Sequence, residues 1–179
     1  MNRGAQRMPD SDARALARRA VAAALNLLAR RDHTGRELAD KLEAKGFDSA
    51  ACQAAVERCR QLGYLDDART AETMAAALRR RGQGVHRIRA RLREKGIDDD
   101  TIAALTAVDA DPDQALAAAR AVYAPRRSRF ERETDPLRRR AKIHRFLQSR
   151  GFGAETVHRL LAEDQSPTPE TGTGLSSVD

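Results

Sequence analysis

Hydrophobic residues recur along this chain at intervals of three and four, which places them on one face of an α-helix. Val85, Ile88 and Leu92 have this spacing, and Val21 and Leu25 repeat it near the N-terminus. Charged side chains and alanine, which favour helices, fill most of the positions between them. Valine, isoleucine, threonine and aromatic residues, which a sheet would need, are too few. The pattern therefore predicts an all-α protein.

One short pattern occurs three times: an amphipathic helix ends in a basic residue and a glycine, and a large apolar residue follows. The copies occupy residues 37–47, 87–97 and 142–152. Their glycines lie 50 and 55 positions apart and are Gly46, Gly96 and Gly151. Glycine allows the left-handed backbone that closes a helix, and the cation faces the negative helix end. Repetition of one helical unit predicts a tandem array, which usually offers an extended surface to a partner.

Helix-start signals divide the chain into three units of three helices. Thr34 and Glu37 form a capping box at the second helix of unit one, and Asp111-Pro112 opens unit three. We expect a flexible N-terminal arm, three three-helix repeats in an elongated, curved array with nine principal helices, and a disordered tail. The predicted bounds are 1–18, 19–66, 67–110, 111–163 and 164–179. Repeats this small need contacts with their neighbours for stability.

The cysteines and the lack of long apolar runs indicate in which compartment the protein is expected. Cys52 and Cys59 lie two turns apart on one predicted helix, too far for a disulfide, so both are expected to be free and buried. No apolar run is long enough to span a bilayer, and the first residues lack the hydrophobic segment of a signal peptide. We expect a cytoplasmic protein without membrane contact, and a monomer.

The positive charge is concentrated in two segments. The chain has 33 Lys and Arg against 26 Asp and Glu, a net charge of +7. Residues 79–95 carry eight cations and a single acid, and residues 126–150 carry ten cations and three acids. Such clusters favour a polyanion or an acidic protein surface as the partner, whereas solvated helix faces are the alternative.

Helical spacing places many of these cations outward. With Ile88 toward the core, Arg87 and Arg91 stack on one flank of their helix, and Arg89 and Arg93 on the other. The candidate contact residues of the first zone are Arg79, Arg80, Arg81, Arg87, Arg91 and Lys95. Those of the second zone are Arg138, Arg139, Arg140, Lys142 and Arg145. No aromatic residues alternate with these arginines, so DNA binding would be salt-sensitive and largely independent of sequence.

Motifs for the common catalytic and cofactor sites are missing. None of the four histidines belongs to a zinc motif, and Gly82-Gln-Gly84 lacks the third glycine and the strand of a dinucleotide loop. The three acids at residues 98–100 are more simply the cap of a helix. We predict no catalytic residue, no cofactor and no metal, and therefore a binding protein rather than an enzyme.

An ordered set of motifs resembles the RecX family of recombinase regulators. The motifs are Leu-Leu-Ala-Arg-Arg at 27–31, the first repeated pattern at 37–47, Gly-Tyr-Leu-Asp-Asp at 63–67, Arg-Gly-Gln-Gly-Val-His-Arg-Ile at 81–88, and residues 92–97. The likeness covers about residues 20–163. Two features depart from the family pattern: Thr70 stands where an aromatic residue is usual, and the joint at 126–136 is longer.

The resemblance implies a non-enzymatic modulator of RecA, mainly an inhibitor. Similar proteins bind along the groove of the RecA–single-stranded DNA filament and restrain its growth, strand exchange, ATP hydrolysis and the co-protease activity behind the SOS response. The expected partners in DNA repair and recombination are the RecA filament and single-stranded DNA, with double-stranded DNA as a further candidate. Two alternatives stay open: a stand-alone, sequence-independent DNA-binding protein of helix-turn-helix type, and a helical scaffold that binds an acidic protein.

Overall fold

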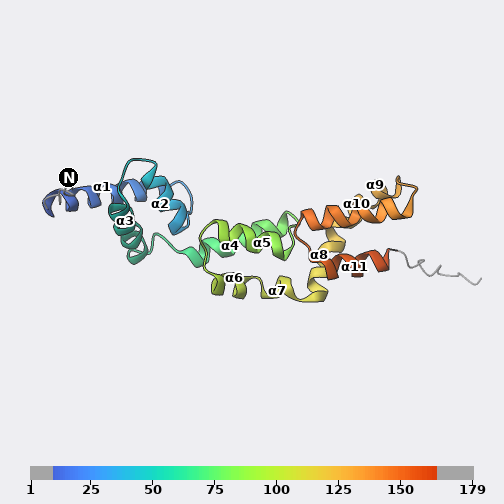
Figure 1. Cartoon of the computed structure of the whole chain (residues 1–179). Helices are drawn as coiled ribbons and strands as arrows, with labels where there is room; N and C mark the ends of the chain where they lie inside the picture. Colours follow the sequence, from blue (N-terminus) through green and yellow to red (C-terminus); the bar gives the residue numbers. More distant parts are fainter. Residues whose placement is uncertain (1–9, 165–179) are drawn as a thin grey trace, which may run out of the picture.

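A computed structural model describes residues 10–164, and every regular element within this range is a helix (Figure 1). The α-helices are α1 (Asp10–Leu28), α2 (Gly35–Glu43), α3 (Ser49–Gln61), α4 (Asp67–Arg80), α5 (Val85–Glu94), α6 (Asp99–Leu105), α7 (Ala107–Ala110), α8 (Pro112–Tyr123), α9 (Arg127–Glu131), α10 (Pro136–Ser149) and α11 (Ala154–Glu163). A 3-10 turn, η1 (Ala124–Arg126), joins α8 to α9.

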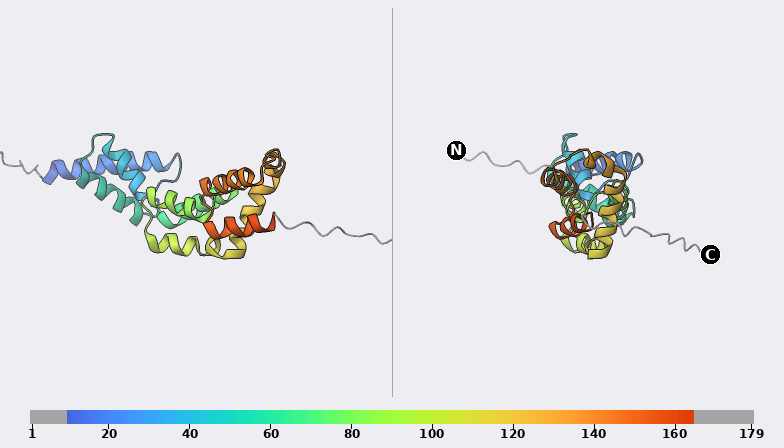
Figure 2. Two further views of the ribbon diagram at one scale, coloured as in Figure 1. Left: turned by 45° about the vertical axis from the view of Figure 1, so that its right-hand side comes forward. Right: turned by 90° about the vertical axis from the view of Figure 1, so that its right-hand side faces the viewer.

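Three groups of helices lie in a row. Figure 1 shows α1–α3 at one end, α4–α6 in the middle and α8, α10 and α11 at the other end. Seen along the row in Figure 2, right, the groups overlap within a narrow outline. The predicted all-α fold of three tandem three-helix repeats in an elongated array is confirmed. We call the groups repeat 1, repeat 2 and repeat 3.

Each repeat has its own apolar core, and the second helix of each repeat supplies the central residues. These fully buried pairs are Leu38 and Leu42 on α2, Ile88 and Leu92 on α5, and Ile143 and Leu147 on α10. Burying one such side chain stabilises a fold by about 1.5–3 kcal/mol. Cys52 and Cys59 are free and buried in repeat 1, as predicted, and burial raises the pKa of both thiols.

Helix α1 begins earlier than expected. The sequence predicted a flexible arm as far as residue 18, but residues 10–18 belong to α1. Leu16 continues the apolar stripe of Ala20 and Ala24 by one more turn and packs against the core of repeat 1. This contact explains why the helix extends toward the N-terminus. Residues 1–9 of the predicted arm and 165–179 of the predicted tail lie outside the described range.

The long joint before α10 is also helical where the sequence suggested a plain linker. It contains η1 and α9, and Phe130 of α9 packs between two aromatic rings of repeat 3. The Phe130 ring centroid lies 5.9 Å from that of Tyr123 and 5.4 Å from that of Phe146. The extra residues of this joint therefore enlarge the core of repeat 3.

Neighbouring repeats meet where their second helices follow one another end to end. At the junction of repeats 1 and 2, the Thr34 hydroxyl at the start of α2 donates to the Lys95 carbonyl oxygen, at 2.7 Å. At the junction of repeats 2 and 3, the Gly84 and His86 amides donate to the carbonyl oxygens of Arg150 and Gly151, at 2.8 and 3.1 Å. The unpaired carbonyls at one helix end thus bind donors at the start of the next. The helices α10, α5 and α2 therefore follow one another, with the end of each near the start of the next.

Candidate cationic interface

The outward face of α10 carries three exposed cations at helical spacing, Arg138, Lys142 and Arg145. Ile143 and Leu147 anchor the opposite face in the core of repeat 3. Residues three and four positions apart lie one above another on a helix. The three cations therefore form a row along α10.

The exposed face of α5 continues this row. Arg87 and Arg91 point away from the core that Ile88 and Leu92 fill. Across the junction, Arg87 Nη1 donates to the Ser149 carbonyl oxygen at the end of α10, at 3.4 Å. We call the five side chains the cationic row: Arg138, Lys142, Arg145, Arg87 and Arg91. At 1.5 Å per residue, the two helices span about 35 Å.

Three cations of the row have a carboxylate beside them. The pairs are Arg91 with Glu94 at 2.6 Å, Lys142 with Glu133 at 2.5 Å, and Arg138 with Asp135 at 3.4 Å. The hydrogen bond from Lys142 lowers the pKa of Glu133, which keeps that acid charged. All of these cations are exposed, and exposed pairs usually contribute at most about 1 kcal/mol. An approaching phosphate can therefore replace the carboxylate.

Arg79 lies apart from the row and serves a structural role. Its guanidinium binds both carboxylate oxygens of Asp109, at 2.6 to 3.0 Å, and donates to the Leu105 carbonyl oxygen at 2.6 Å. The hydrogen bond to Asp109 raises the pKa of Arg79. These contacts tie the end of α4 to α6 and α7.

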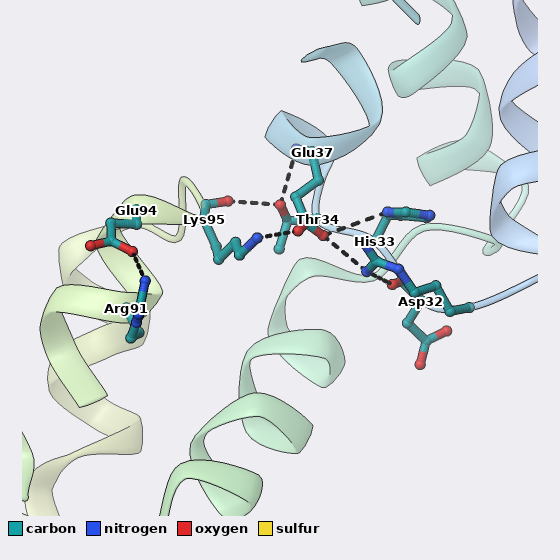
Figure 3. Close-up of polar contacts among 8 residues, drawn as sticks. Asp32, His33, Thr34, Glu37, Arg91, Glu94 and Lys95 are labelled. Atoms are coloured by element: carbon teal, nitrogen blue, oxygen red, sulfur yellow. Dashed lines mark hydrogen bonds and ion pairs between the residues drawn. The ribbon is translucent and has the colours of Figure 1, made fainter. Parts of the chain in front are cut away.

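Lys95 links repeat 2 to repeat 1. Figure 3 shows its ammonium group directed at Glu37 of α2, with which it forms an ion pair. Arg31 donates to the other oxygen of the Glu37 carboxylate at 3.3 Å. Burial by itself would raise the pKa of Glu37, but the hydrogen bonds from Lys95 and Arg31 outweigh it and lower the pKa to about 2. The side chain of Lys95 therefore stabilises the contact between repeats 1 and 2.

A buried histidine lies beside this ion pair. His33 is almost fully buried, and its Nδ1 lies 3.5 Å from a Glu37 oxygen without hydrogen-bond geometry (Figure 3). Burial, followed by the charge of Arg31, lowers the pKa of His33. The imidazole is therefore neutral, and the Glu37 carboxylate forms its ion pairs with Lys95 and Arg31.

The remaining predicted cations face in other directions. Arg80 and Arg81 are exposed at the end of α4 and line a cleft between repeats 2 and 3. Arg140 borders a shallow hollow with Leu137 and His144, and Arg139 is half-buried. The structure therefore separates the two predicted zones into the cationic row, the cleft and the junction of repeats 1 and 2.

The cleft has a volume of about 890 Å³ and includes arginines that the sequence analysis did not select as contact residues. These are Arg89, Arg126, Arg150 and Arg159. The only sequence signal was the position of Arg150 just before Gly151, where the other repeats have Lys45 and Lys95. The sequence could not show that four distant segments meet here.

In the part of the chain that is described, no three His, Cys, Asp or Glu side chains are grouped so that they could hold a metal ion. No helix in that part is long and apolar enough to cross a membrane.

Comparison with known families matches each repeat separately. The description "RecX, first three-helix domain" matches residues 20–59, the second three-helix domain matches residues 66–105, and the third matches residues 113–161. These ranges lie in repeats 1, 2 and 3 respectively.

Curated relatives are similar over most of their length. A "Regulatory protein RecX" of Halorhodospira halophila is 43% identical over 141 residues, which cover 78% of this chain and 84% of the relative. A "Regulatory protein RecX" of Stenotrophomonas maltophilia is 38% identical over 146 residues, which cover 80% of this chain and 86% of the relative.

Two solved structures share the fold. The crystal structure of RecX from Lactobacillus salivarius has a TM-score of 0.72 at 19% identity, and the match covers 83% of this chain and 96% of that one. A second crystal structure, of "regulatory protein RecX", has a TM-score of 0.74 at 19% identity and covers 85% and 74%. At this identity the likeness concerns the fold alone.

Proposed function

Because the chain belongs to the RecX family of regulatory proteins, we propose that it restrains the RecA recombinase by lying along the RecA–single-stranded DNA filament. In this proposal it acts by binding and not by catalysis. It slows ATP hydrolysis and filament growth because it occupies a surface that neighbouring RecA protomers and DNA share.

The observation that supports the proposal is the cationic row. Five exposed cations lie on α10 and α5, two helices that meet end to end and together span about 35 Å, which suits the regularly spaced phosphates of an extended strand. The exposed positions of these two described helices hold no Phe, Tyr or Trp side chain on which a base could stack. Contact with the phosphate backbone, without base recognition, is the mode of binding that this chemistry favours.

The junctions give the row a fixed direction. Hydrogen bonds between backbone groups join α10 to α5, so the two halves of the row are held together before binding. A surface that is already ordered loses less conformational entropy when it binds. An elongated array of this kind can contact several subunits of a filament at once, which a compact domain of the same size cannot.

Reversal of charge in the row tests the proposal. We expect the double variant R87E/R91E to lose most of its inhibition of RecA ATPase on single-stranded DNA, because both groups would repel phosphate. The control is R30E/R58E, which makes the same change in net charge on exposed residues of repeat 1. Filament length, measured by electron microscopy on the same samples, should return to the RecA-only value with R87E/R91E and not with the control.

Two outcomes would contradict this proposal. Full inhibition by a folded R87E/R91E protein, with a circular dichroism spectrum like that of the parent, would exclude the row. Equal affinity for bare DNA and for RecA-coated DNA would indicate a stand-alone DNA-binding protein instead. For neutralised variants, each lost phosphate contact should lower the salt slope of binding to single strands by about 0.7.

A further inference from the structure

The cleft between repeats 2 and 3 is separate from the cationic row, and none of the five residues of the row lines it. Its walls are the end of α4, the start of α5, helices α7 and α8, and the start of α11. The volume of about 890 Å³ falls in the range of sites that hold a small molecule or a short peptide.

Arginines dominate the charged lining of the cleft. Seven arginines and two carboxylates border it, and one of the two carboxylates, that of Asp109, is already bound by Arg79. Arg150 stacks over the Phe146 ring, with its guanidinium carbon 5.0 Å from the centroid, and donates to the Arg81 carbonyl oxygen at 3.0 Å. The rim therefore attracts negative charge.

Two arginines of the rim are available to a ligand. The side chains of Arg80 and Arg81 are exposed, and neither has a hydrogen bond or ion pair with another described residue. Arg80 is the last residue of α4 and Arg81 is its C-cap, so both line the cleft at the point where α4 ends. Carboxylates are good partners for such groups because guanidinium binds them through paired hydrogen bonds.

The floor of the cleft is aliphatic. It is formed by Val122, Ala118 and Ala115 of α8 and by Val85 of α5, all of which line the cleft. Among the Phe, Tyr and Trp residues, only Phe152 lines the cleft, and it is 5% exposed, so its ring offers little surface to a base. A phosphodiester gains little from such a floor, whereas an aliphatic side chain gains about 25 cal/mol for each Å² that it buries. The combination favours a peptide over a nucleic acid.

We propose that this cleft binds an acidic peptide segment of a partner protein. An aliphatic side chain of the peptide packs on Val122 and Ala118, and flanking carboxylates pair with Arg80 and Arg81. The protein would then have two different contact surfaces: the cationic row for phosphates and the cleft for a protein segment. The proposal stands whether or not the row binds DNA.

The two repeats hold the cleft in a fixed shape. A Cβ atom at Gly82 would lie 2.5 Å from Val122 Cγ2, so α8 packs directly against the joint between α4 and α5. Arg150 donates to the Arg81 carbonyl oxygen, which is a second contact of repeat 3 with the same joint. A preformed site of this kind binds a short peptide at a lower entropic cost than a mobile loop does.

The test uses fluorescence anisotropy with the full chain. The probe is a fluorescein-labelled octapeptide with a central Leu-Leu pair between runs of aspartate and glutamate. We expect saturable binding of the peptide by the parent protein. The affinity should fall at least about tenfold in R80E/R81E, which reverses the charge at the rim, and in A118E, which puts a charged side chain in the aliphatic floor. R30E/R58E and R87E/R91E should bind the peptide as the parent does.

Competition distinguishes a peptide site from general attraction of anions. A peptide with Ser-Ser in place of Leu-Leu should bind at least about tenfold more weakly, and oligo(dT) should compete poorly. The proposal is overturned if the serine peptide binds equally well, if A118E has no effect, or if oligo(dT) displaces the peptide at equal concentration. Lack of any binding up to about 1 mM peptide would also overturn it.

Discussion

Replacement of Gly84 by alanine would test how tightly repeats 2 and 3 are joined. The backbone of Gly84 has φ −80° and ψ 169°, which alanine adopts without strain. The new Cβ, however, would lie 2.5 Å from the Gly151 carbonyl oxygen and 2.6 Å from the Phe152 nitrogen. Both are backbone atoms and cannot turn aside, so repeat 3 must move away by nearly 1 Å to reach an ordinary contact distance.

The magnitude follows from the two hydrogen bonds that this movement breaks. Gly84 N donates to Arg150 O at 2.8 Å, and His86 N donates to Gly151 O at 3.1 Å. Each is worth about 1 kcal/mol, so we expect the junction to lose about 2 kcal/mol. At 1.4 kcal/mol per factor of ten, repeat 3 should open about 30 times more often. Two smaller effects act as well. Alanine lowers the conformational entropy of the unfolded chain, which stabilises the variant by about 0.4–1 kcal/mol. Alanine is also a weaker N-cap than glycine, which destabilises the variant.

Gly153→Ala is the matched control. Gly153 is also an N-cap glycine, with φ −70° and ψ 157°, and it lies at the same junction. Its added Cβ would meet only the flexible His86 ring, at 3.3 Å. Both variants therefore share the cap and unfolded-state effects, and only Gly84→Ala adds a clash between two backbones.

Hydrogen exchange measured by mass spectrometry resolves the two effects. In Gly84→Ala, the amides of α10 and α11 should exchange about 30 times faster, because a repeat without its neighbour is less stable. In Gly153→Ala the increase should stay below about threefold. Equal exchange in the two variants would refute the conclusion that close approach of the two backbones holds the repeats together.

Two further predictions concern side chains that the structure ties down. The pKa of Glu37 is about 2 in the folded protein against an ordinary 4.5, so the stability from its ion pairs is complete above pH 4.5 and is lost as the pH falls toward 2. Lys95 is 38% exposed, and solvent screening limits the loss of unfolding free energy to about 1–2 kcal/mol. Urea unfolding should show this loss of stability at pH 3 in the parent protein. E37Q, which has no carboxylate at this position, should not show it. For Arg79 and Asp109, a double-mutant cycle with R79Q and D109N should give a coupling of about 1–2 kcal/mol in urea unfolding, and a value under about 0.3 kcal/mol would contradict the structural role of Arg79.

The parts of the fold that depend on local sequence were predictable. Gly46, Gly96 and Gly151 all have positive φ and close their helices, as the repeated pattern indicated. The Thr34 hydroxyl accepts from the Glu37 amide at 3.2 Å, which is one half of the predicted capping box. The Glu37 carboxylate, which was to reach back to Thr34, pairs with Lys95 and Arg31 instead. Helix caps and apolar stripes are made by residues within a few positions of each other, so a single sequence contains the whole signal.

The roles of the cations depend on distant residues, and the sequence could not reveal them. Lys45, Lys95 and Arg150 occupy the same position in the repeated pattern. Lys45 is exposed, Lys95 pairs with Glu37 of another repeat, and Arg150 joins repeat 3 to repeat 2. Spacing predicts that each of these side chains leaves the core, but it cannot predict which surface the side chain then meets.

The ends of the array explain why the series of successive helices stops after three members. At one end, a Cβ at Gly46 would meet no atom of residues 10–164 within 4 Å, so no described repeat docks on this joint as happens at the other two. At the opposite end, α10 begins with Pro136, which has no amide hydrogen. The Asp135 carboxylate already accepts from the Leu137 and Arg138 amides, at 2.8 and 3.2 Å. A second copy that approached with its Gly46 joint would find these donors occupied, so we expect no head-to-tail addition at this end.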